Sequence, residues 1–205
     1  DLNPELKTVK YVFGDIPQIY GGLSLAAHNT VLPTWINGIA TYSLWWLINL
    51  DEWVFYTGKR EYLQEQKEYI VSLVRQVLEN VDENGYFTAS DYIDWPSKGC
   101  PSAKAGTKAL FVLCMKACER ILDILGEAEL KTECEKKRLL AEKDQEACGN
   151  LKQIAALLLL VGIANEDSKT CLQTGGAEGF STFMSYYILT AMAKCASAEE
   201  TLAAL

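Results

Sequence analysis

Apolar residues recur every three or four positions along most of the chain, and this spacing constrains the fold more than any other sequence feature. Between residues 60 and 80, a stripe of apolar side chains lies opposite a face filled with Glu, Lys, Arg and Gln. No segment shows the apolar-polar alternation of a half-buried strand. The spacing therefore predicts an all-α protein whose consecutive antiparallel helices, joined by short links, form helical hairpins.

The same pattern indicates a series of helices and two long polar loops. We expect helices over residues 34–57, 60–80, 102–125, 127–147, 151–164 and 180–195, with a seventh beginning at Ala198. The loops 82–101 and 166–179 differ, and no motif recurs, so a solenoid of equal repeats is not expected. Residues 1–30 are expected to form an irregular leader before a domain over residues 31–205, because prolines and glycines mark turns there. These residues are Pro4, Gly14, Pro17, Gly21 and Gly22.

The 205-residue chain has 27 acidic and 19 basic side chains, which gives a net charge of −8. A surface of that sign repels phosphate backbones and anionic lipids, so binding to nucleic acid or to a membrane surface is disfavoured. No apolar run approaches the roughly 20 residues that cross a bilayer. A neutral sugar is compatible with this charge.

Seven cysteines and a single histidine limit the metal chemistry of the chain. Cys114 and Cys118 are four residues apart in an apolar helical stretch, which indicates buried thiols on one helix face. No CxxC pair is present and His28 stands alone, so neither a zinc site nor another cofactor is expected. Free thiols are favoured over a disulfide framework. The cysteines do not determine the compartment, and the parent enzyme can be secreted or periplasmic.

The polar, aromatic loop 86–99 contains the first candidate site, at Asp94 and Trp95. An aromatic ring stacks on the apolar face of a pyranose, and a neighbouring carboxylate accepts hydrogen bonds from its hydroxyls. Alternatively, Trp95 packs under the loop while Asp94 caps backbone donors. One Asp-Trp pair is a weak motif, and the residues alone favour this alternative.

A glycine-rich segment over residues 174–184 is the second candidate, with Glu178 as its carboxylate. Its glycines permit a close approach of the backbone to another group. Glu178 can instead stabilise the positive end of the helix that follows, and the residues favour that role.

Seven aromatic residues fall within one predicted helix, and we expect some of them to lie in the core because they cover too much of its circumference to share one groove. Trp35 and Trp45, toward its start, are the candidates for sugar contacts. The seven are Trp35, Tyr42, Trp45, Trp46, Trp53, Phe55 and Tyr56. The chain contains no P-loop, GxSxG, dinucleotide-binding or HExxH motif.

The order and spacing of several strings resemble the six-hairpin glycosidase domain of bacterial α-L-rhamnosidases, glycoside hydrolase family 78. These strings are Leu32-Pro33-Thr34-Trp35, Ser43-Leu44-Trp45-Trp46-Leu47, Tyr56-Thr57-Gly58-Lys59, Tyr92-Ile93-Asp94-Trp95-Pro96 and Gly175-Gly176-Ala177-Glu178-Gly179-Phe180-Ser181-Thr182-Phe183-Met184. The resemblance extends from about residue 18 to near the end of the chain. It implies that the helical hairpins form part of an (α/α)6 toroid, and it carries the Asp94-Trp95 pair over as a sugar contact.

The resemblance also implies inverting hydrolysis of terminal α-L-rhamnose, for which an acid and a base stand about 6.5–9.5 Å apart. The family's acid belongs to an Asp-Arg-rich motif that precedes these strings, and its base to a Thr-Trp-Glu-type motif that follows them. Neither motif is found in this sequence, and Glu178 does not match the base. The expectation is a segment without catalytic residues that is inactive alone, with exposed apolar flanks that favour a homodimer.

Two other functions stay open on the sequence. The chain can be a complete, non-catalytic helical module that binds a glycan or a protein. It can also belong to a different six-hairpin enzyme, such as an unsaturated-uronide hydrolase, although the acidic surface disfavours an anionic uronide.

Overall fold

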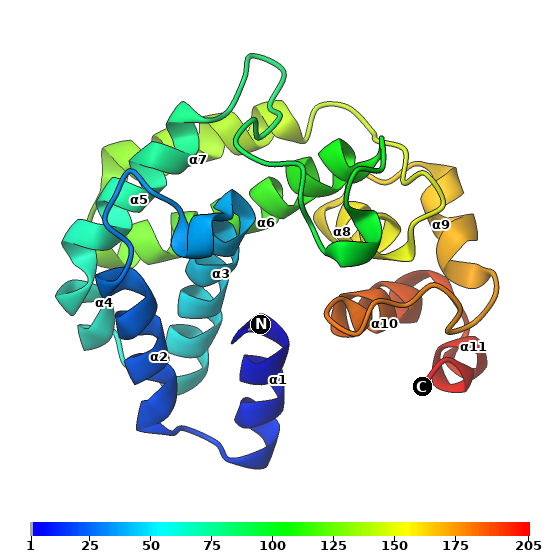
Figure 1. Cartoon of the computed structure of the whole chain (residues 1–205), viewed down its shortest axis with the longest axis horizontal. Helices are drawn as coiled ribbons and strands as arrows, with labels where there is room; N and C mark the ends of the chain where they lie inside the picture. Colours follow the sequence, from blue (N-terminus) through cyan, green and yellow to red (C-terminus); the bar gives the residue numbers. More distant parts are fainter. Residues whose placement is uncertain (1) are drawn as a thin grey trace. The chain divides into compact units, whose positions relative to one another are not determined.

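A computed structural model describes residues 2–205 and divides them into two compact units (Figure 1). The first unit contains residues 2–81 and 113–138, and the second contains residues 82–112 and 139–205. Two helices, α6 (Ala103–Leu125) and α7 (Ala128–Ala141), contribute residues to both units. The described residues form helices, turns and one isolated bridge but no β-strand, so the prediction of an all-α protein is confirmed.

The first unit is built around α3 (Ala40–Thr57), the most apolar of its helices, with α1, α2 and α5 packed against it. Trp53 is fully buried, and Trp46 donates a 3.0 Å hydrogen bond from Nε1 to the carbonyl oxygen of Leu23 in α2. The surrounding elements are α1 (Leu2–Val12), α2 (Pro17–His28), η1 (Ile36–Gly38, a 3-10 turn), α4 (Glu61–Glu65) and α5 (Lys67–Glu79). The aromatic residues of α3 thus form much of this core.

The prediction of an irregular leader over residues 1–30 is wrong for the described residues, which form α1 and α2. Pro17 occupies the first turn of α2, where a missing backbone N–H costs no helical hydrogen bond. Gly14 adopts a left-handed conformation with φ of 70° between the two helices. Leu6 and Leu23 are almost completely buried, so the gain from packing outweighs the low helix propensity of Gly21 and Gly22.

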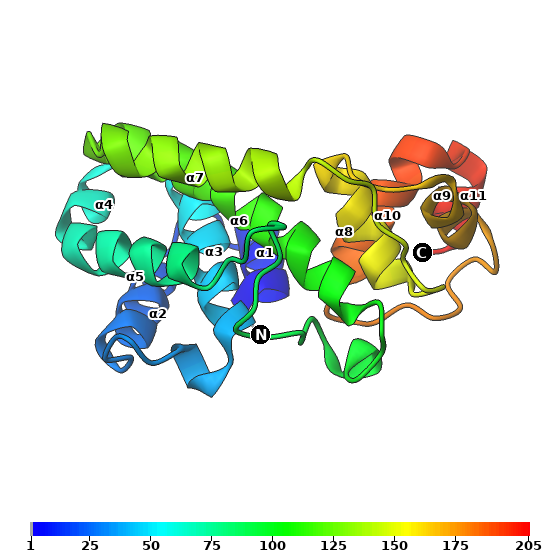
Figure 2. The same ribbon diagram turned by 90° about the horizontal axis from the view of Figure 1, so that it is seen from above.

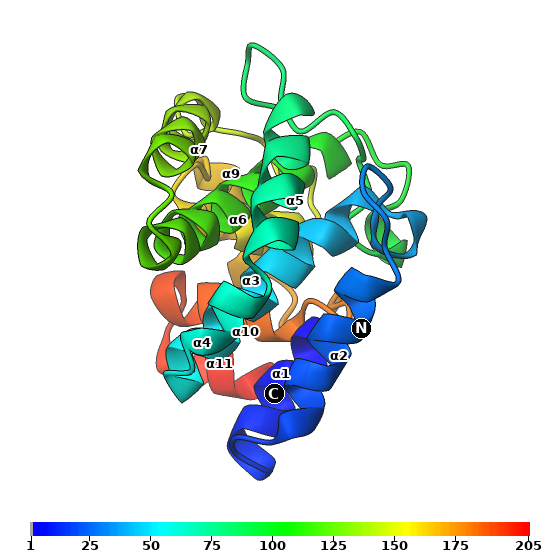
Figure 3. The ribbon, with the colours of Figure 1, turned by 90° about the vertical axis from the view of Figure 1, so that its left-hand side faces the viewer.

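Several predicted helices are shorter or more broken than expected, among them the expected helix over residues 127–147, which ends at Ala141, and that over residues 180–195, which begins at Ser185. The helix expected from residue 34 begins at Ala40, because Asn37 and Gly38 adopt left-handed φ angles of 52° and 71°. Such angles end an α-helix of L-residues. The helix expected over residues 60–80 is interrupted at Gln66, and α4 leads there into α5 (Figure 3).

The second unit packs α8 (Lys152–Val161) against α9 (Glu166–Gln173) and α10 (Ser185–Cys195) (Figure 2). A short α11 (Ala198–Ala203) follows α10. Most of α8 is buried, in agreement with the prediction of an interior helix. The predicted loop 166–179 contains α9, whose first turn is capped by the Asn165 side chain accepting a 3.2 Å hydrogen bond from the Ser168 backbone.

The turn that opens the long loop of the second unit is held by Asp82 and by Gly85. One carboxylate oxygen of Asp82 accepts hydrogen bonds of 2.9 Å from the backbone nitrogens of Asn84 and Tyr86. Gly85 has a φ of 79°, and a Cβ there would lie 2.6 Å from backbone atoms of Ala141 in α7. Only glycine fits this approach of two backbones.

The helices of the described chain include none that is both long and apolar enough to span a membrane.

Candidate functional site

Asp94 and Trp95, the neighbouring residues expected to contact a sugar, have different environments. Asp94 is buried, and its Oδ1 accepts a 3.0 Å hydrogen bond from the backbone nitrogen of Ser97. The Ser97 hydroxyl accepts a 3.2 Å bond from the Asp94 nitrogen, which completes a capping box around the 3-10 turn η2 (Trp95–Ser97). Asp94 therefore has the capping role of the alternative interpretation, and its Oδ2 is buried without a hydrogen-bond partner.

Trp95 projects from this turn with 70% of its surface exposed, so the expectation that it packs under the loop is wrong. The ring of Tyr92 meets it edge-on at a centroid separation of 5.5 Å. The Lys98 ammonium lies 5.0 Å from the centre of the indole. Both contacts orient the ring. The loop thus presents a large, exposed aromatic surface on a hydrogen-bonded turn.

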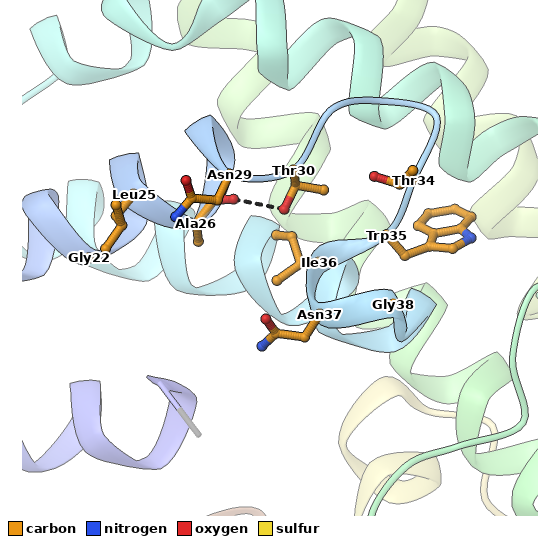
Figure 4. Close-up of a pocket in the computed structure, with 10 residues that line it drawn as sticks. All are labelled: Gly22, Leu25, Ala26, Asn29, Thr30, Thr34, Trp35, Ile36, Asn37 and Gly38. Carbon is orange, nitrogen blue, oxygen red and sulfur yellow. Dashed lines mark hydrogen bonds between the residues drawn. The ribbon is translucent and has the colours of Figure 1, made fainter.

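Trp35 belongs to the first unit, where it lines a pocket of about 540 Å³ between the end of α2 and η1. Figure 4 shows its indole on the opposite side of the labelled group from Leu25. The Thr30 hydroxyl in this pocket donates a 2.8 Å hydrogen bond to the carbonyl oxygen of Ala26. This bond provides a partner for one of the backbone carbonyl groups in the last turn of α2. Trp35 is half-buried and accessible from the pocket.

Trp45 does not fit its predicted role as a sugar contact. It lies within α3 and is 4% exposed, because its position in the helix faces the core of the first unit. Trp46 and Trp53 of the same aromatic run are also buried, as expected of several members of that run. Phe55 and Tyr56, in contrast, are exposed, with 85% and 39% of their surface open to solvent.

A buried ionic cluster in the second unit has no counterpart among the predicted sites. Lys108 of α6 is almost completely buried, and its Nζ lies 2.6 Å from Oε1 of Glu146. The Tyr86 hydroxyl donates a 2.5 Å hydrogen bond to the same oxygen. This bond, together with burial, raises the pKa of Tyr86 to about 12. The charge of Lys108 is paired with that of Glu146, and Tyr86 stays protonated at neutral pH. The cluster therefore anchors the loop and does not transfer protons.

The sequence does not predict this cluster, because one of its residues falls within an expected surface helix. Glu146 lies in a segment expected to continue a charged surface helix to residue 147, but α7 ends at Ala141. The chain beyond it therefore turns inward, and the backbone nitrogen of Glu146 donates a 2.9 Å bond to the Ile163 carbonyl oxygen. A buried lysine on an otherwise apolar helix face is the one signal that predicts a nearby carboxylate.

Two cysteines meet at a second pocket of this unit, which has a volume of about 570 Å³. Cys148 precedes α8 and is almost completely buried, whereas Cys171 of α9 is half-buried. Their side chains hydrogen-bond to each other, and both line the pocket. Lys152 lines it as well, and its Nζ donates a 2.5 Å hydrogen bond to the Gly176 carbonyl oxygen. All seven cysteines of the chain are free thiols.

Glu178 also lines the thiol pocket, in the glycine-rich turn that precedes α10. Its backbone nitrogen donates a 2.9 Å hydrogen bond to the Gly175 carbonyl oxygen. The prediction that it stabilises the start of the next helix is wrong, because residues 179–184 separate it from Ser185, where α10 begins. No group of three or more metal-binding side chains of His, Cys, Asp or Glu gathers anywhere in residues 2–205.

Models of known protein families give no match to this chain, and neither does a comparison with curated proteins. The fold and the sites define an all-helical protein of two compact units. Its second unit carries an exposed tryptophan on a hydrogen-bonded turn, a buried ionic cluster and a thiol-lined pocket.

Proposed function

We propose that this chain is a segment of an α-L-rhamnosidase-like glycoside hydrolase and that it contacts the sugar without hydrolysing it. The observation that carries the proposal is the exposure of Trp95, which is 70% open to solvent on a turn fixed by the Asp94 capping box. Large aromatic side chains are normally withdrawn from water, so an exposed one on an ordered loop is typical of a binding surface. The segment Tyr92-Ile93-Asp94-Trp95-Pro96, which contains this tryptophan, resembles a string of the rhamnosidase family.

In this proposal, Trp95 and Asp94 have separate tasks. The indole stacks on the C–H face of the pyranose, while Tyr92 and Lys98 fix its orientation through the contacts described above. Asp94 is a positioning residue, because its carboxylate is buried and bonded to the turn. A preset ring binds with less loss of side-chain freedom than a mobile one.

The proposal includes an (α/α)6 toroid for the parent enzyme, supported by the helical hairpins of the chain. Apolar side chains are exposed at the end of α1 and near the end of α3, where the Tyr56 hydroxyl donates a 3.3 Å hydrogen bond to the Lys10 carbonyl oxygen. Additional hairpins of a ring, or a second copy of the chain, would cover them. The residues are Tyr11, Val12, Phe13 and Phe55.

Inverting hydrolysis needs a carboxylic acid and a carboxylate on opposite sides of the glycosidic bond. No carboxylate of the chain matches either motif of the family, so the chain alone supplies the sugar contact and not the proton transfers. We therefore expect binding without turnover from these 205 residues.

The test measures L-rhamnose binding and hydrolysis with the same protein. Saturation-transfer NMR should detect weak binding of L-rhamnose, and the signal should disappear in Trp95→Ala. The matched control is Phe55→Ala, which removes an even more exposed aromatic ring outside the loop and should leave binding unchanged. Hydrolysis of p-nitrophenyl α-L-rhamnoside should stay at background.

Each outcome distinguishes the proposal from its alternatives. Turnover by the 205-residue chain would show that a catalytic pair lies within it and would overturn the assignment of Trp95 as part of a non-catalytic segment. Equal binding by wild type and Trp95→Ala would remove the tryptophan from the sugar site. Binding of a different glycan with no rhamnose preference would favour a general glycan-binding module.

A further inference from the structure

The thiol pocket of the second unit contains two cysteines in contact, and this arrangement differs from that of the other cysteine neighbours in the chain. Cys148 and Cys171 come from different segments, the loop before α8 and the helix α9, and hydrogen-bond to each other. Cys114 and Cys118, in contrast, lie 3.9 Å apart within one helix and are both completely buried. Only the first pair combines contact with access from a pocket.

The two thiols of the pocket differ in exposure, which assigns them different tasks. Cys171 is half-buried and lines the pocket, so a small reagent reaches its sulfur first. Cys148 lines the same pocket but is almost completely buried, and the backbone of Asn150 hydrogen-bonds to its sulfur. A sheltered, hydrogen-bonded thiol next to an accessible one is the arrangement of a resolving cysteine beside an attacking one.

We propose that Cys171 and Cys148 form a thiol-modification site that reacts with small-molecule disulfides and closes into an intramolecular disulfide. In the first step, Cys171 loses its proton to solvent. The Cys171 sulfur attacks one sulfur of the small disulfide RSSR, forms a Cys171–S–S–R bond and expels RS⁻.

In the second step, the Cys148 thiolate attacks the sulfur of Cys171, and the proton that Cys171 released protonates the first RS⁻. The Cys148–Cys171 bond forms, and a second RS⁻ leaves. Starting from one thiol and one thiolate, the two cysteines are oxidised to a disulfide, and RSSR is reduced to RSH and RS⁻. No other oxidant is required.

The charges of the pocket favour a neutral reagent. Two acidic residues, Asp167 and Glu178, and one basic residue, Lys152, line it, and the chain as a whole carries a net charge of −8. An anionic disulfide is repelled by such a protein more than a neutral one. Hydroxyethyl disulfide is therefore the appropriate probe.

The test uses a Cys100→Ser/Cys195→Ser background, which leaves Cys171 as the one half-buried cysteine among the five that remain. After reaction with hydroxyethyl disulfide, the protein should become lighter by two hydrogen atoms. A tryptic peptide pair linked through Cys148 and Cys171 should appear. Adding Cys148→Ser should instead trap a mercaptoethanol adduct on Cys171, and adding Cys114→Ser should change nothing.

The pH dependence of the reaction separates this site from an ordinary accessible thiol. The hydrogen bond to Cys148, together with burial, raises the pKa of the attacking Cys171 above the ordinary thiol value of 9.0, so the reaction rate should still be rising at pH 9.0. With Cys148→Ser, that cause is removed and the midpoint of adduct formation should fall toward 9.0. Circular dichroism of each variant controls for folding.

Three results would overturn the proposal. The first is an adduct that persists on Cys171 although Cys148 is present. The second is a Cys171 that does not react at all in the folded background protein. The third is a rate midpoint that Cys148→Ser leaves unchanged.

Discussion

The two compact units differ in how far their ion pairs and their thiols are exposed. In the first unit the thiols are sealed in the core, while the ion pair between Asp51 and Arg120 is open, with 56% of the arginine side chain exposed. In the second unit the ion pair between Lys108 and Glu146 is closed, with the lysine side chain 1% exposed, while a pair of thiols lines a pocket.

This difference separates stability from chemistry. A core filled by aromatic rings, such as that around α3, gains most from excluding water and leaves little room for reactive groups. A core that holds a charged pair requires that pair for its integrity, because either charge alone would be buried without compensation. The second unit therefore concentrates both the structural sensitivity to polar substitutions and the accessible functional groups.

The most severe way to test the contrast is to remove one charge from each ion pair. Glu146→Gln should lower the free energy of unfolding by about 3–5 kcal/mol, because Lys108, with 1% of its side chain exposed, would be left buried and unpaired. Asp51→Asn should cost only about 1–2 kcal/mol, because the Arg120 side chain that loses its partner is 56% exposed. Urea denaturation of both variants measures the difference.

The double variant Lys108→Met/Glu146→Leu provides the control, because replacing both charges by apolar side chains is close to neutral. It should recover most of the stability lost in Glu146→Gln. Equal losses for Glu146→Gln and Asp51→Asn would contradict the distinction between a closed and an open pair.

A smaller effect should sharpen the assignment of the loop in the second unit. Asp94→Ala removes the side-chain cap of η2 and should cost about 1 kcal/mol. It should also weaken rhamnose binding without removing Trp95, since the ring would lose its fixed turn. Hydrogen exchange of residues 92–98 should increase, whereas Asp91→Ala, at an exposed position of the same loop, should leave it unchanged.

The smallest effect is a stability profile that changes sign with pH. Between about pH 6 and 9.0, Cys148 is ionised in the folded chain and protonated in the unfolded one, because bonding from Cys171 lowers its pKa. The unfolded state then binds more protons, so the free energy of unfolding should rise with pH across this window. This stabilisation should be lost as the pH falls through 6. Cys148→Ser should flatten the rise.

Above pH 9.0 the sealed thiols of the first unit should reverse the trend. Burial raises the pKa of Cys134, and the bond to Cys114 together with burial raises that of Cys118. The folded state keeps these protons after the unfolded state has lost them, so stability should fall. Urea unfolding across the range measures both limbs, and a fall that Cys134→Ser leaves unaltered would assign it to other groups.

The sequence predicts the helical class and much of the order of helices because apolar spacing is a local property. α8 was expected to be interior from its composition alone, and most of it is buried. The breaks were not predicted, because they depend on single backbone angles such as those of Asn37 and Gly38. The short α9 was missed because its first turn depends on the Asn165 cap rather than on an apolar stripe.

The candidate sites divide along the same line. The loop with Trp95 was identified because polar and aromatic residues gather in one stretch of sequence, but the exposure of the ring depends on tertiary packing. Trp45 and Trp46 are neighbours in sequence and both are buried, which helical spacing favours for such a run. The pairing of Cys148 with Cys171 results from the packing of α9 on α8, which no local pattern encodes.

Gly85 has a consequence for the history of the chain. Its left-handed backbone and the closeness of Ala141 leave no room for any other side chain, whereas the surrounding turn is held by groups with common substitutes. Mutation can therefore drift through most of the loop while this position stays fixed. We therefore expect a glycine at this position in any chain that keeps this contact between the turn and α7.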